Sequence, residues 1–209
     1  MSTRHDDLRS EICNVGRRLY ERGLVAGHDG NISVRWTGDE VLCTPTRVCK
    51  GWMRPEQLCL VDPAGARLGG PLPPSSEIQM HLTILRHRSD VHAVVHAHPP
   101  HVLAFAATNT ALPRAILPEV EVALGEVPIV PYVTPGTPQL GEALIPHLTG
   151  ASALILANHG SVTFAESLEV ALWLTEILDH YCHVILLSRP LGPLAALTTE
   201  QLGVLRGGR

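Results

Sequence analysis

The segment Val94-Val95-His96-Ala97-His98-Pro99-Pro100 determines how the rest of the sequence can fold and function. Its apolar residues predict a buried strand over 91–98, which the two prolines end. Because residues two apart in a strand point to the same face, the imidazoles of His96 and His98 should project together at the rim of a sheet. They would form half of a divalent-metal site, although such a pair alone is more often structural or solvent-facing.

A third histidine stands in a similar position far along the chain. Asn158-His159-Gly160 follows the apolar run 153–157, which predicts a second buried strand ending at a sheet rim. In isolation this triplet is typical of an ordinary turn. Combined with the first pair, it would supply the three nitrogens that hold a catalytic metal and leave one position open to substrate.

The composition indicates one globular domain over residues 1–209. Hydrophobic residues make up 45% and charged residues 17%, which excludes a disordered or fibrous chain. The net charge of -4 and the absence of a Lys/Arg run argue against a nucleic-acid surface. Twelve histidines raise the expectation of a metal site.

Cysteine usage and the termini indicate a cytoplasmic protein. The five cysteines are odd in number and lack CxxC spacing, which is typical of reduced thiols. The N-terminal MSTRHDDLRS has no apolar core of a secretory signal. Charges at Glu169, Glu176 and Asp179 interrupt the apolar region 168–188, so we expect an amphipathic helix and no membrane span.

Hydrophobic periodicity predicts an alternation of helices and strands. Helices are expected over 8–19, 77–88, 102–107, 140–148 and 167–187, and strands over 32–35, 41–44, 58–61, 91–98, 127–133, 153–157 and 161–164. Ser76 and Gln79 have the spacing of a capping box. The region beyond 188 suggests a loosely held tail. Several strands are joined by short turns, so we expect a mixed, largely antiparallel sheet with helices packed on its faces.

Three short segments are candidates for anion binding. Ser75-Ser76-Glu77 lies at a predicted helix N-terminus, where N–H groups and hydroxyls favour an anion; plain N-capping is the alternative. The turn 27–31 (GHDGN) can present backbone N–H groups to phosphate, or be merely a turn. Residues 44–46 (TPT) are similarly ambiguous.

Taken in order, GNIS (30–33), TPT (44–46), PSSE (74–77), HAH (96–98) and NHG (158–160) resemble the class II aldolase/adducin family. The resemblance covers most of the chain, and the joint order of the motifs is highly specific. Within the family, the sequence is similar to small bacterial sugar-phosphate aldolases of the fuculose-1-phosphate type.

The resemblance implies a three-layer α/β/α sandwich and a homotetramer with active sites between subunits. It also implies Zn²⁺ bound by His96, His98 and His159, with Mn²⁺ or Co²⁺ as alternatives. Glu77 would be the catalytic carboxylate, which ligates the metal and then acts as acid and base. The substrate phosphate would be held by Gly30, Asn31, Thr46, Ser75 and Ser76.

The implied reaction is retro-aldol cleavage of a 1-phosphoketose to dihydroxyacetone phosphate and an aldehyde. The apolar stretch 116–132 (Ile116, Leu117, Val120, Val122, Val127) suggests a 5-deoxypentulose or methylthioribulose phosphate. An imine mechanism would depend on Lys50 alone, because it is the only lysine in the chain. We expect Lys50 to supply charge near the phosphate loop, or to be a solvated surface residue.

Two positions depart from the aldolase pattern. Arg47 stands where the fuculose-type aldolases have a glycine after TPT. The stretch 117–121 lacks the tyrosine that acts as proton donor in those aldolases, so Glu119 and Tyr132 are the candidates for that role. Alternative functions are therefore a sugar-phosphate dehydratase, an epimerase or a sugar-acid-phosphate decarboxylase on the same site. A non-catalytic adducin-like module is the third class, against which the retained histidines and Glu77 argue.

Overall fold

The computed structural model describes residues 2–207, except for the side chains of 2–6 and 206. The helices are α1 (Ser2–Glu21), α2 (Ile78–His87), α3 (Pro100–Thr108), α4 (Pro118–Ala123), α5 (Pro138–Leu144), α6 (Leu168–Ser188) and α7 (Thr199–Gly207). The strands are β1 (Asn31–Arg35), β2 (Val41–Cys43), β3 (Cys59–Val61), β4 (Arg67–Gly69), β5 (Ala93–Ala97), β6 (Ile129–Val130), β7 (Ala153–Leu156) and β8 (Gly160–Ala165). Short 3-10 helices are η1 (Lys50–Trp52), η2 (Pro55–Gln57), η3 (Ile145–His147) and η4 (Arg189–Leu191).

The strands form one mixed sheet in the order β4-β3-β2-β1-β5-β8-β7-β6. Among the described residues, every neighbouring pair is antiparallel except β6 and β7, which run parallel. β5 lies inside the sheet and is buried along its whole length, which explains why its sequence is almost continuously apolar. The predicted mixed, largely antiparallel sheet is confirmed.

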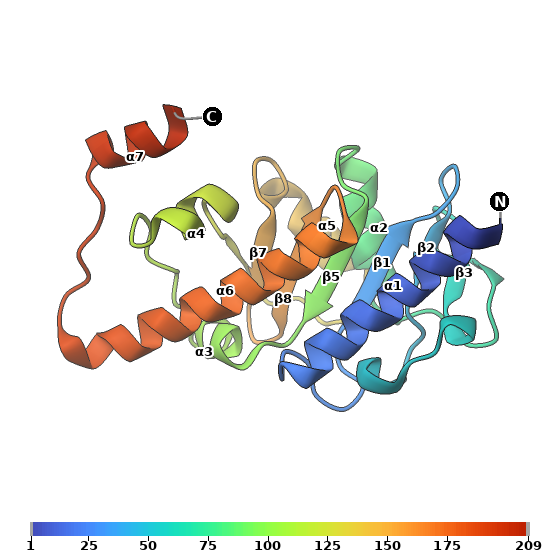
Figure 1. The fold of residues 1–209 in the computed structure, drawn as a ribbon. Coiled ribbons are helices and arrows are strands. Elements are labelled where there is room, and N and C mark those ends of the chain that lie inside the picture. The colour runs from blue at the N-terminus through green and yellow to red at the C-terminus, as the bar shows by residue number, and fades with distance from the viewer. Residues whose placement is uncertain (1, 208–209) are drawn as a thin grey trace.

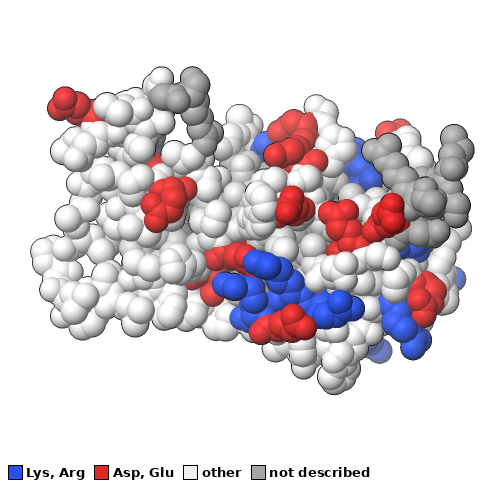
Figure 2. All heavy atoms as spheres, in the orientation of Figure 1, with Lys and Arg blue, Asp and Glu red and all other residues white. Residues whose placement is uncertain are grey.

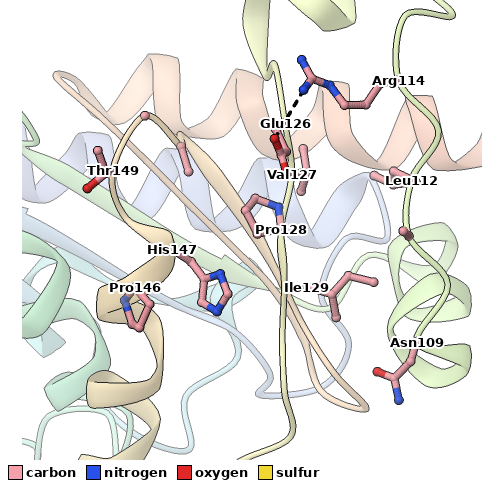
Figure 3. Close-up of a pocket in the computed structure, with 13 residues that line it drawn as sticks. Asn109, Leu112, Arg114, Glu126, Val127, Pro128, Ile129, Pro146, His147 and Thr149 are labelled. Atoms are coloured by element: carbon pink, nitrogen blue, oxygen red, sulfur yellow. Dashed lines mark hydrogen bonds and ion pairs between the residues drawn. The ribbon is translucent and has the colours of Figure 1, made fainter.

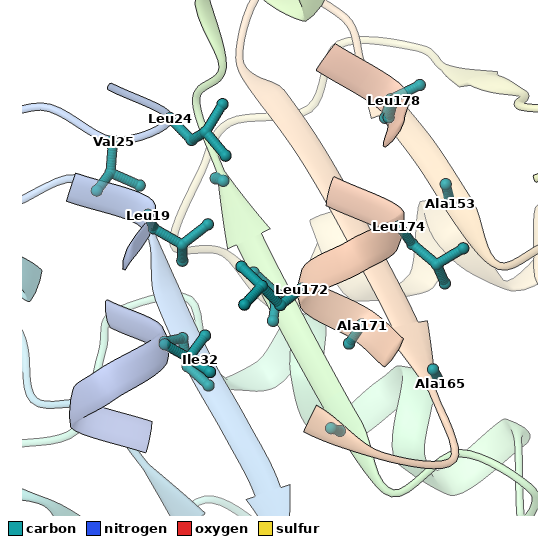
Figure 4. Packing of buried hydrophobic residues seen from close by; sticks show 14 of the residues in the cluster. Leu19, Leu24, Val25, Ile32, Ala153, Ala165, Ala171, Leu172, Leu174 and Leu178 are labelled. Carbon is teal, nitrogen blue, oxygen red and sulfur yellow. The ribbon is translucent and has the colours of Figure 1, made fainter. Parts of the chain in front are cut away.

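Helices cover both faces of this sheet (Figure 1). α1, α3 and α6 pack on one face, where Leu19 of α1 and Leu172 of α6 belong to one apolar cluster (Figure 4). α2 and α5 pack on the other face over a second cluster that includes Leu140. Val95 belongs to the first cluster and its neighbour Val94 to the second, because successive residues of a strand face opposite sides. The result is the predicted three-layer α/β/α sandwich, with His96 directed, like Val94, to the α2 side.

α6 is the long apolar helix of the first layer. Leu168–Leu191 is the one stretch among the described residues whose length and composition would suit a bilayer span. About half of the residues of α6 are buried, most of them in the first cluster, whereas Glu176 pairs with Arg18 and Arg22. Basic and acidic side chains therefore adjoin on this face (Figure 2). Pairs of this exposed kind contribute about 1 kcal/mol or less.

The C-terminal tail and several short elements differ from the prediction. The region beyond 188 is not simply a loose tail: it contains α7, and Leu197 N donates to Ala115 O at 2.6 Å to tie it to the body. The strand expected over 127–133 is reduced to β6. β4 and α4 were not predicted, because both are short and their exposed residues carry little periodic signal.

The start of α2 also differs from the predicted capping box. Glu77 is the N-cap residue and its side chain makes no capping bond, while Gln79 Nε2 donates to Ala64 O at 2.7 Å. The serine that bonds to the backbone at this helix start is Ser75 and not the predicted Ser76, because Ser75 Oγ accepts a hydrogen bond from Glu77 N at 3.2 Å. The carboxylate of Glu77 is thus free to serve another purpose at the sheet rim.

Candidate metal centre

One end of the sheet gathers the polar segments that the sequence singled out. β1 begins there, β5 ends there and β8 begins there, because neighbouring antiparallel strands alternate in direction. Asn31 lies directly opposite His96 in the β1–β5 ladder. His98 follows the last residue of β5, one position beyond the strand in which it was predicted, and His159 lies between β7 and β8.

The imidazoles of His96, His98 and His159 converge. They are the one metal-ligand cluster found among the described residues, and their ligand nitrogens all lie within 4.8 Å of one another. Nε2 of His96 and Nε2 of His98 are 3.0 Å apart. A tetrahedral zinc site with bonds of about 2.0–2.1 Å places its ligand nitrogens about 3.3 Å apart. The three side chains therefore fit a first-row divalent cation with a fourth position open.

Neighbouring acceptors orient two of these rings. Nδ1 of His96 lies 2.8 Å from Ser161 O, and Nδ1 of His98 lies 3.4 Å from Oδ2 of Asp29. A hydrogen bond at Nδ1 fixes the tautomer that leaves Nε2 available as a ligand. Nδ1 of His159 is buried without a hydrogen-bond partner among the described residues, while its Nε2 lies 3.2 Å from Oε1 of Glu77.

Burial keeps two of the rings neutral. Burial, with a smaller contribution from the nearby His96, lowers the pKa of His98 to about 4 against the opposing effects of Asp29 and Glu77. Burial likewise lowers the pKa of His159 to about 4, again with a contribution from His96. Metal binding requires neutral imidazole, so both side chains are in the competent form at neutral pH.

Glu77 brings a carboxylate against this cluster. Its Oε2 lies 3.3 Å from Nε2 of His96 and accepts a hydrogen bond of 2.9 Å from Nδ2 of Asn31. Burial is the largest single influence and raises the pKa of Glu77, but His96, His159 and Asn31 together outweigh it. The net pKa lies well below the usual range, so this carboxylate is ionised at neutral pH.

Two glycines and one asparagine allow the strands to approach so closely. A Cβ at Gly30 would lie 2.8 Å from His96 O, and one at Gly160 would lie 2.7 Å from Cδ2 of His98. Gly30 also has a φ of +71°. Asn158 adopts the left-handed conformation with φ 57°, which asparagine tolerates better than most residues and which turns the chain at His159.

A pocket of about 240 Å³ adjoins the cluster and contains the predicted anion-binding residues. Its lining includes Gly30, Asn31, Thr46, Ser75, Ser76, Glu77 and His98. An isolated bridge between Pro45 and Pro74 and a bond from Ser75 N to Thr44 O (3.2 Å) hold the two loops together. Hydroxyl and amide groups thus surround a small space beside the imidazoles.

Other predicted positions are not brought to this pocket. Glu119 is exposed on α4 and Tyr132 is 58% exposed, and neither lines the pocket. The apolar stretch 116–132 does not form its wall either, which corrects the prediction of an apolar substrate pocket there. Val120 is buried in the first apolar cluster with Ile116, Leu117 and Val127 packed against that cluster, while Val122 is 40% exposed.

Sequence reasoning did not identify Asp29 or His81 as part of the site. Asp29 lies in the turn 27–31 (GHDGN), which was considered only as a phosphate-binding loop. The presence of a carboxylate in that turn was the one signal that could have suggested a partner for His98. His81 stands one helical turn after Glu77 and is 1% exposed, with neither ring nitrogen hydrogen-bonded to a described residue. Its neighbours could not be inferred from periodicity, because a histidine on the apolar face of α2 reads simply as core.

A larger pocket of about 690 Å³ lies at the other end of β6 and β7 (Figure 3). Asn109 and Leu112 line one side of it, and Pro146, His147 and Thr149 line the other. Arg114 pairs across it with Glu126 at 3.3 Å. Its charged groups are exposed and already paired, so nothing in its geometry resembles the convergence at the histidines.

Three imidazoles and a carboxylate thus converge beside a polar pocket on an α/β/α sandwich, and this set of ligands could hold a divalent metal ion. Comparison with known proteins identifies the family. Residues 10–186 match the family model described as Class II Aldolase and Adducin N-terminal domain. The chain belongs to this family.

Its relatives carry two kinds of activity. The chain is 34% identical over 168 residues to a 3-oxo-tetronate 4-phosphate decarboxylase of Pectobacterium atrosepticum, covering 78% of this chain and 76% of that one. It is 33% identical over 170 residues to an L-fuculose phosphate aldolase of Methanococcus maripaludis, covering 81% and 91%. Among solved structures, YgbL of Escherichia coli, for which aldolase, epimerase and decarboxylase are all named, superposes with a TM-score of 0.91 at 30% identity and covers 97% of this chain and 99% of its own.

Proposed function

We propose that the protein is a metal-dependent carbon–carbon lyase acting on a phosphorylated ketone. The leading reaction is cleavage of a 1-phosphoketose to dihydroxyacetone phosphate and an aldehyde. The observation that carries this proposal is the convergence of three imidazoles and the Glu77 carboxylate beside a polar pocket.

His96, His98 and His159 would hold the metal, which we propose to be Zn²⁺, with Mn²⁺ and Co²⁺ as alternatives. When bound, it would supply the positive charge that stabilises the electron pair left on the ketone by the broken C–C bond. Family membership supports a divalent metal in this role.

Glu77 is the proposed base. It is ionised, so it can accept the proton of the hydroxyl group from which the aldehyde forms. Asn31 donates to its Oε2 and fixes its orientation. Ser75, Ser76, Thr46, Asn31 and the backbone of Gly30 would bind the phosphate, since all line the same pocket.

The proton that returns to the leaving group would come from a neighbouring subunit. Tyr132 and Glu119 are the candidates, since both are exposed and neither lines the pocket of its own subunit. We therefore propose a homotetramer in the cytoplasm, with the pockets completed at subunit interfaces. Size-exclusion chromatography with light scattering tests the assembly.

Decarboxylation is the second candidate function, and the named relatives favour it specifically. In 3-oxo-tetronate 4-phosphate, the carboxylate sits on the carbon next to the ketone. Loss of CO₂ followed by protonation of that carbon leaves dihydroxyacetone phosphate, the same product half that aldol cleavage releases. In this route no hydroxyl proton has to be removed, because CO₂ takes the place of the aldehyde as the fragment released.

The test must therefore measure the second product. Zinc-loaded protein is incubated with 1-phosphoketoses and with 3-oxo-tetronate 4-phosphate, and dihydroxyacetone phosphate, aldehyde and CO₂ are quantified separately. Aldehyde from a phosphoketose supports the aldolase, and CO₂ supports the decarboxylase. Loss of water or formation of an epimer would support a dehydratase or epimerase instead, and no product with the metal bound would overturn the lyase proposal. His96→Ala is the inactive control.

A further inference from the structure

Lys50 is the only lysine of the chain, and it is buried. Its residue exposure is 2%, so it is not the solvated surface lysine that the sequence left open. It begins η1, directly after the loop that follows β2. Burying an ammonium group is costly unless it is hydrogen-bonded and its charge is balanced, so its position needs a physical reason.

The helix α1 fixes the backbone of Lys50 from behind. A Cβ at Gly16 would lie 3.0 Å from Lys50 O and 3.4 Å from Lys50 Cβ. A Cβ at Gly51 would lie 2.5 Å from Cδ1 of Tyr20. The two glycines therefore let η1 pack directly against α1.

The ammonium group joins two loops of the small pocket. Lys50 Nζ donates to His28 O at 3.0 Å and to Val48 O at 2.7 Å. An ammonium carries three N–H donors, so one remains after these two bonds. No carboxylate of the described residues forms an ion pair with it. The ammonium is thus hydrogen-bonded to carbonyls, while Asp29 and Glu77 act on it through space without contacting it.

The same pocket already uses its two acids elsewhere. Lys50 lines it together with His28, Asp29, Arg47, Glu77 and His98, which are its other titratable or charged groups. Asp29 contacts His98, and Glu77 contacts the imidazole cluster. Burial lowers the pKa of Lys50 to about 8, while Cys49, Asp29 and Glu77 oppose that effect. In its protonated form the amine is held as a hydrogen-bond donor by the two carbonyls of His28 and Val48.

We infer that Lys50 is the counter-charge for the substrate's phosphate: its free N–H donates to a phosphate oxygen from beneath the pocket and makes the pocket selective for a dianion. This inference rests on the proposed function and deepens it: Lys50 adds a buried cation to the exposed Arg47, whereas the pocket hydroxyls and amides alone would hold a neutral polyol as readily. Lys50 is a specificity-determining residue in this scheme and takes no part in bond cleavage.

A single lysine permits a direct test on the unaltered protein. Zinc-loaded protein labelled with [6-¹³C]lysine should give one side-chain signal, whose titration reads the pKa of Lys50. Inorganic phosphate is the probe, and calorimetry confirms that it binds. Above pH 8 phosphate is already a dianion. We therefore expect phosphate to shift the signal, raise the Lys50 pKa and cause net proton uptake there.

Three variants separate charge from packing. Lys50→Met should weaken phosphate binding by about 10- to 100-fold, the range of one charge-assisted hydrogen bond, with zinc content unchanged. Lys50→Arg keeps the charge and should retain more affinity than Lys50→Met. Arg47→Met removes the exposed cation of the same pocket and should have a smaller effect than Lys50→Met.

The outcomes distinguish the two claims. If phosphate binds the wild type but leaves the lysine signal and its pKa unchanged, the inference is overturned and the proposed lyase stands. Equal phosphate affinity in the wild type and in folded Lys50→Met would overturn the inference in the same way. If the zinc-loaded wild type fails to bind phosphate at all, the proposed phosphate site and this inference are both overturned. The spectrum of the labelled wild type tests the role of Lys50 even if Lys50→Met does not fold.

Discussion

Two pockets lie at opposite ends of β7, and the smaller of them has the more unusual chemistry. The larger one, about 690 Å³, is lined by exposed groups such as Arg114 and Glu126, which pair with each other. The smaller one, about 240 Å³, borders buried groups whose partners are incomplete, including Asn31 Oδ1 and Glu77 Oε1. Unpaired buried polar atoms are costly, so a fold keeps them only where something else offsets the loss. The site is therefore distinguished by its converging buried polar groups and not by its volume.

The largest expected effect comes from removing a central imidazole. His96→Ala should abolish stoichiometric metal binding and with it measurable turnover, because two remaining imidazoles leave the cation under-coordinated. Elemental analysis of the purified protein and a product assay check this. Full metal occupancy in the variant would break the proposed centre.

Glu77→Gln should separate chemistry from metal binding. The amide cannot accept the substrate proton, so kcat should fall by roughly 10²- to 10⁴-fold, the usual contribution of a general base. Metal content should stay near that of the wild type, since the three imidazoles remain. Turnover at the wild-type rate would remove Glu77 from the mechanism.

Asp29→Asn tests the orientation of His98. The carboxylate lies 3.4 Å from Nδ1 of His98, and its loss should weaken metal affinity by about 10- to 100-fold. Competition with a chromophoric chelator measures this without any substrate. The matched control is Asp39→Asn, an exposed acid remote from the cluster, and equal affinities in the two variants would contradict the assignment.

His81→Leu should make the protein more resistant to acid. Burial lowers the pKa of His81 to about 3, against an ordinary value near 6.5. The unfolded state therefore binds the proton more readily, so stability is complete above about pH 6.5 and declines as the pH falls toward 3. The midpoint of acid unfolding, followed by circular dichroism, should move to lower pH. His147→Leu, in the larger pocket, is the control and should leave that midpoint closer to the wild-type value.

The smallest effect is expected in the larger pocket. Arg114→Met removes a half-exposed charge that pairs with the exposed Glu126 and with the nearly buried Glu121, so stability should fall by about 1 kcal/mol or less. Metal content and kcat/KM should be unchanged. A clear loss of either would show that the two pockets are coupled and would undo the comparison.

Sequence patterns predicted the sheet, its helices and the convergence of His96 with His98, because strand periodicity and terminating prolines are local signals. The joint order of short motifs predicted His159 and Glu77 as their neighbours. Lys50 was harder: its burial depends on Gly16 of α1, a contact between segments that no local pattern records. Arg47 takes the place of a glycine, and its φ of 57° shows why a glycine would suit that position.

The apolar stretch 116–132 shows the opposite failure. Its hydrophobic residues were predicted to line the substrate pocket, but apolar character alone does not say which surface they cover. Val120 faces the first apolar cluster and not the small pocket. Assigning such residues to a ligand requires the packing of α4 on α6, which the sequence does not reveal.

The direct pairing of Asn31 with His96 ties the metal centre to the order in which the chain assembles. The proposed ligands His98 and His159 come from segments about sixty residues apart. The imidazoles can converge only after β1, β5 and β8 have paired in register. Closing such long loops is slow compared with forming a helix. During refolding, binding of the metal ion should therefore occur later than the recovery of the helical circular dichroism signal. The time course of metal binding would then report when the sheet is complete.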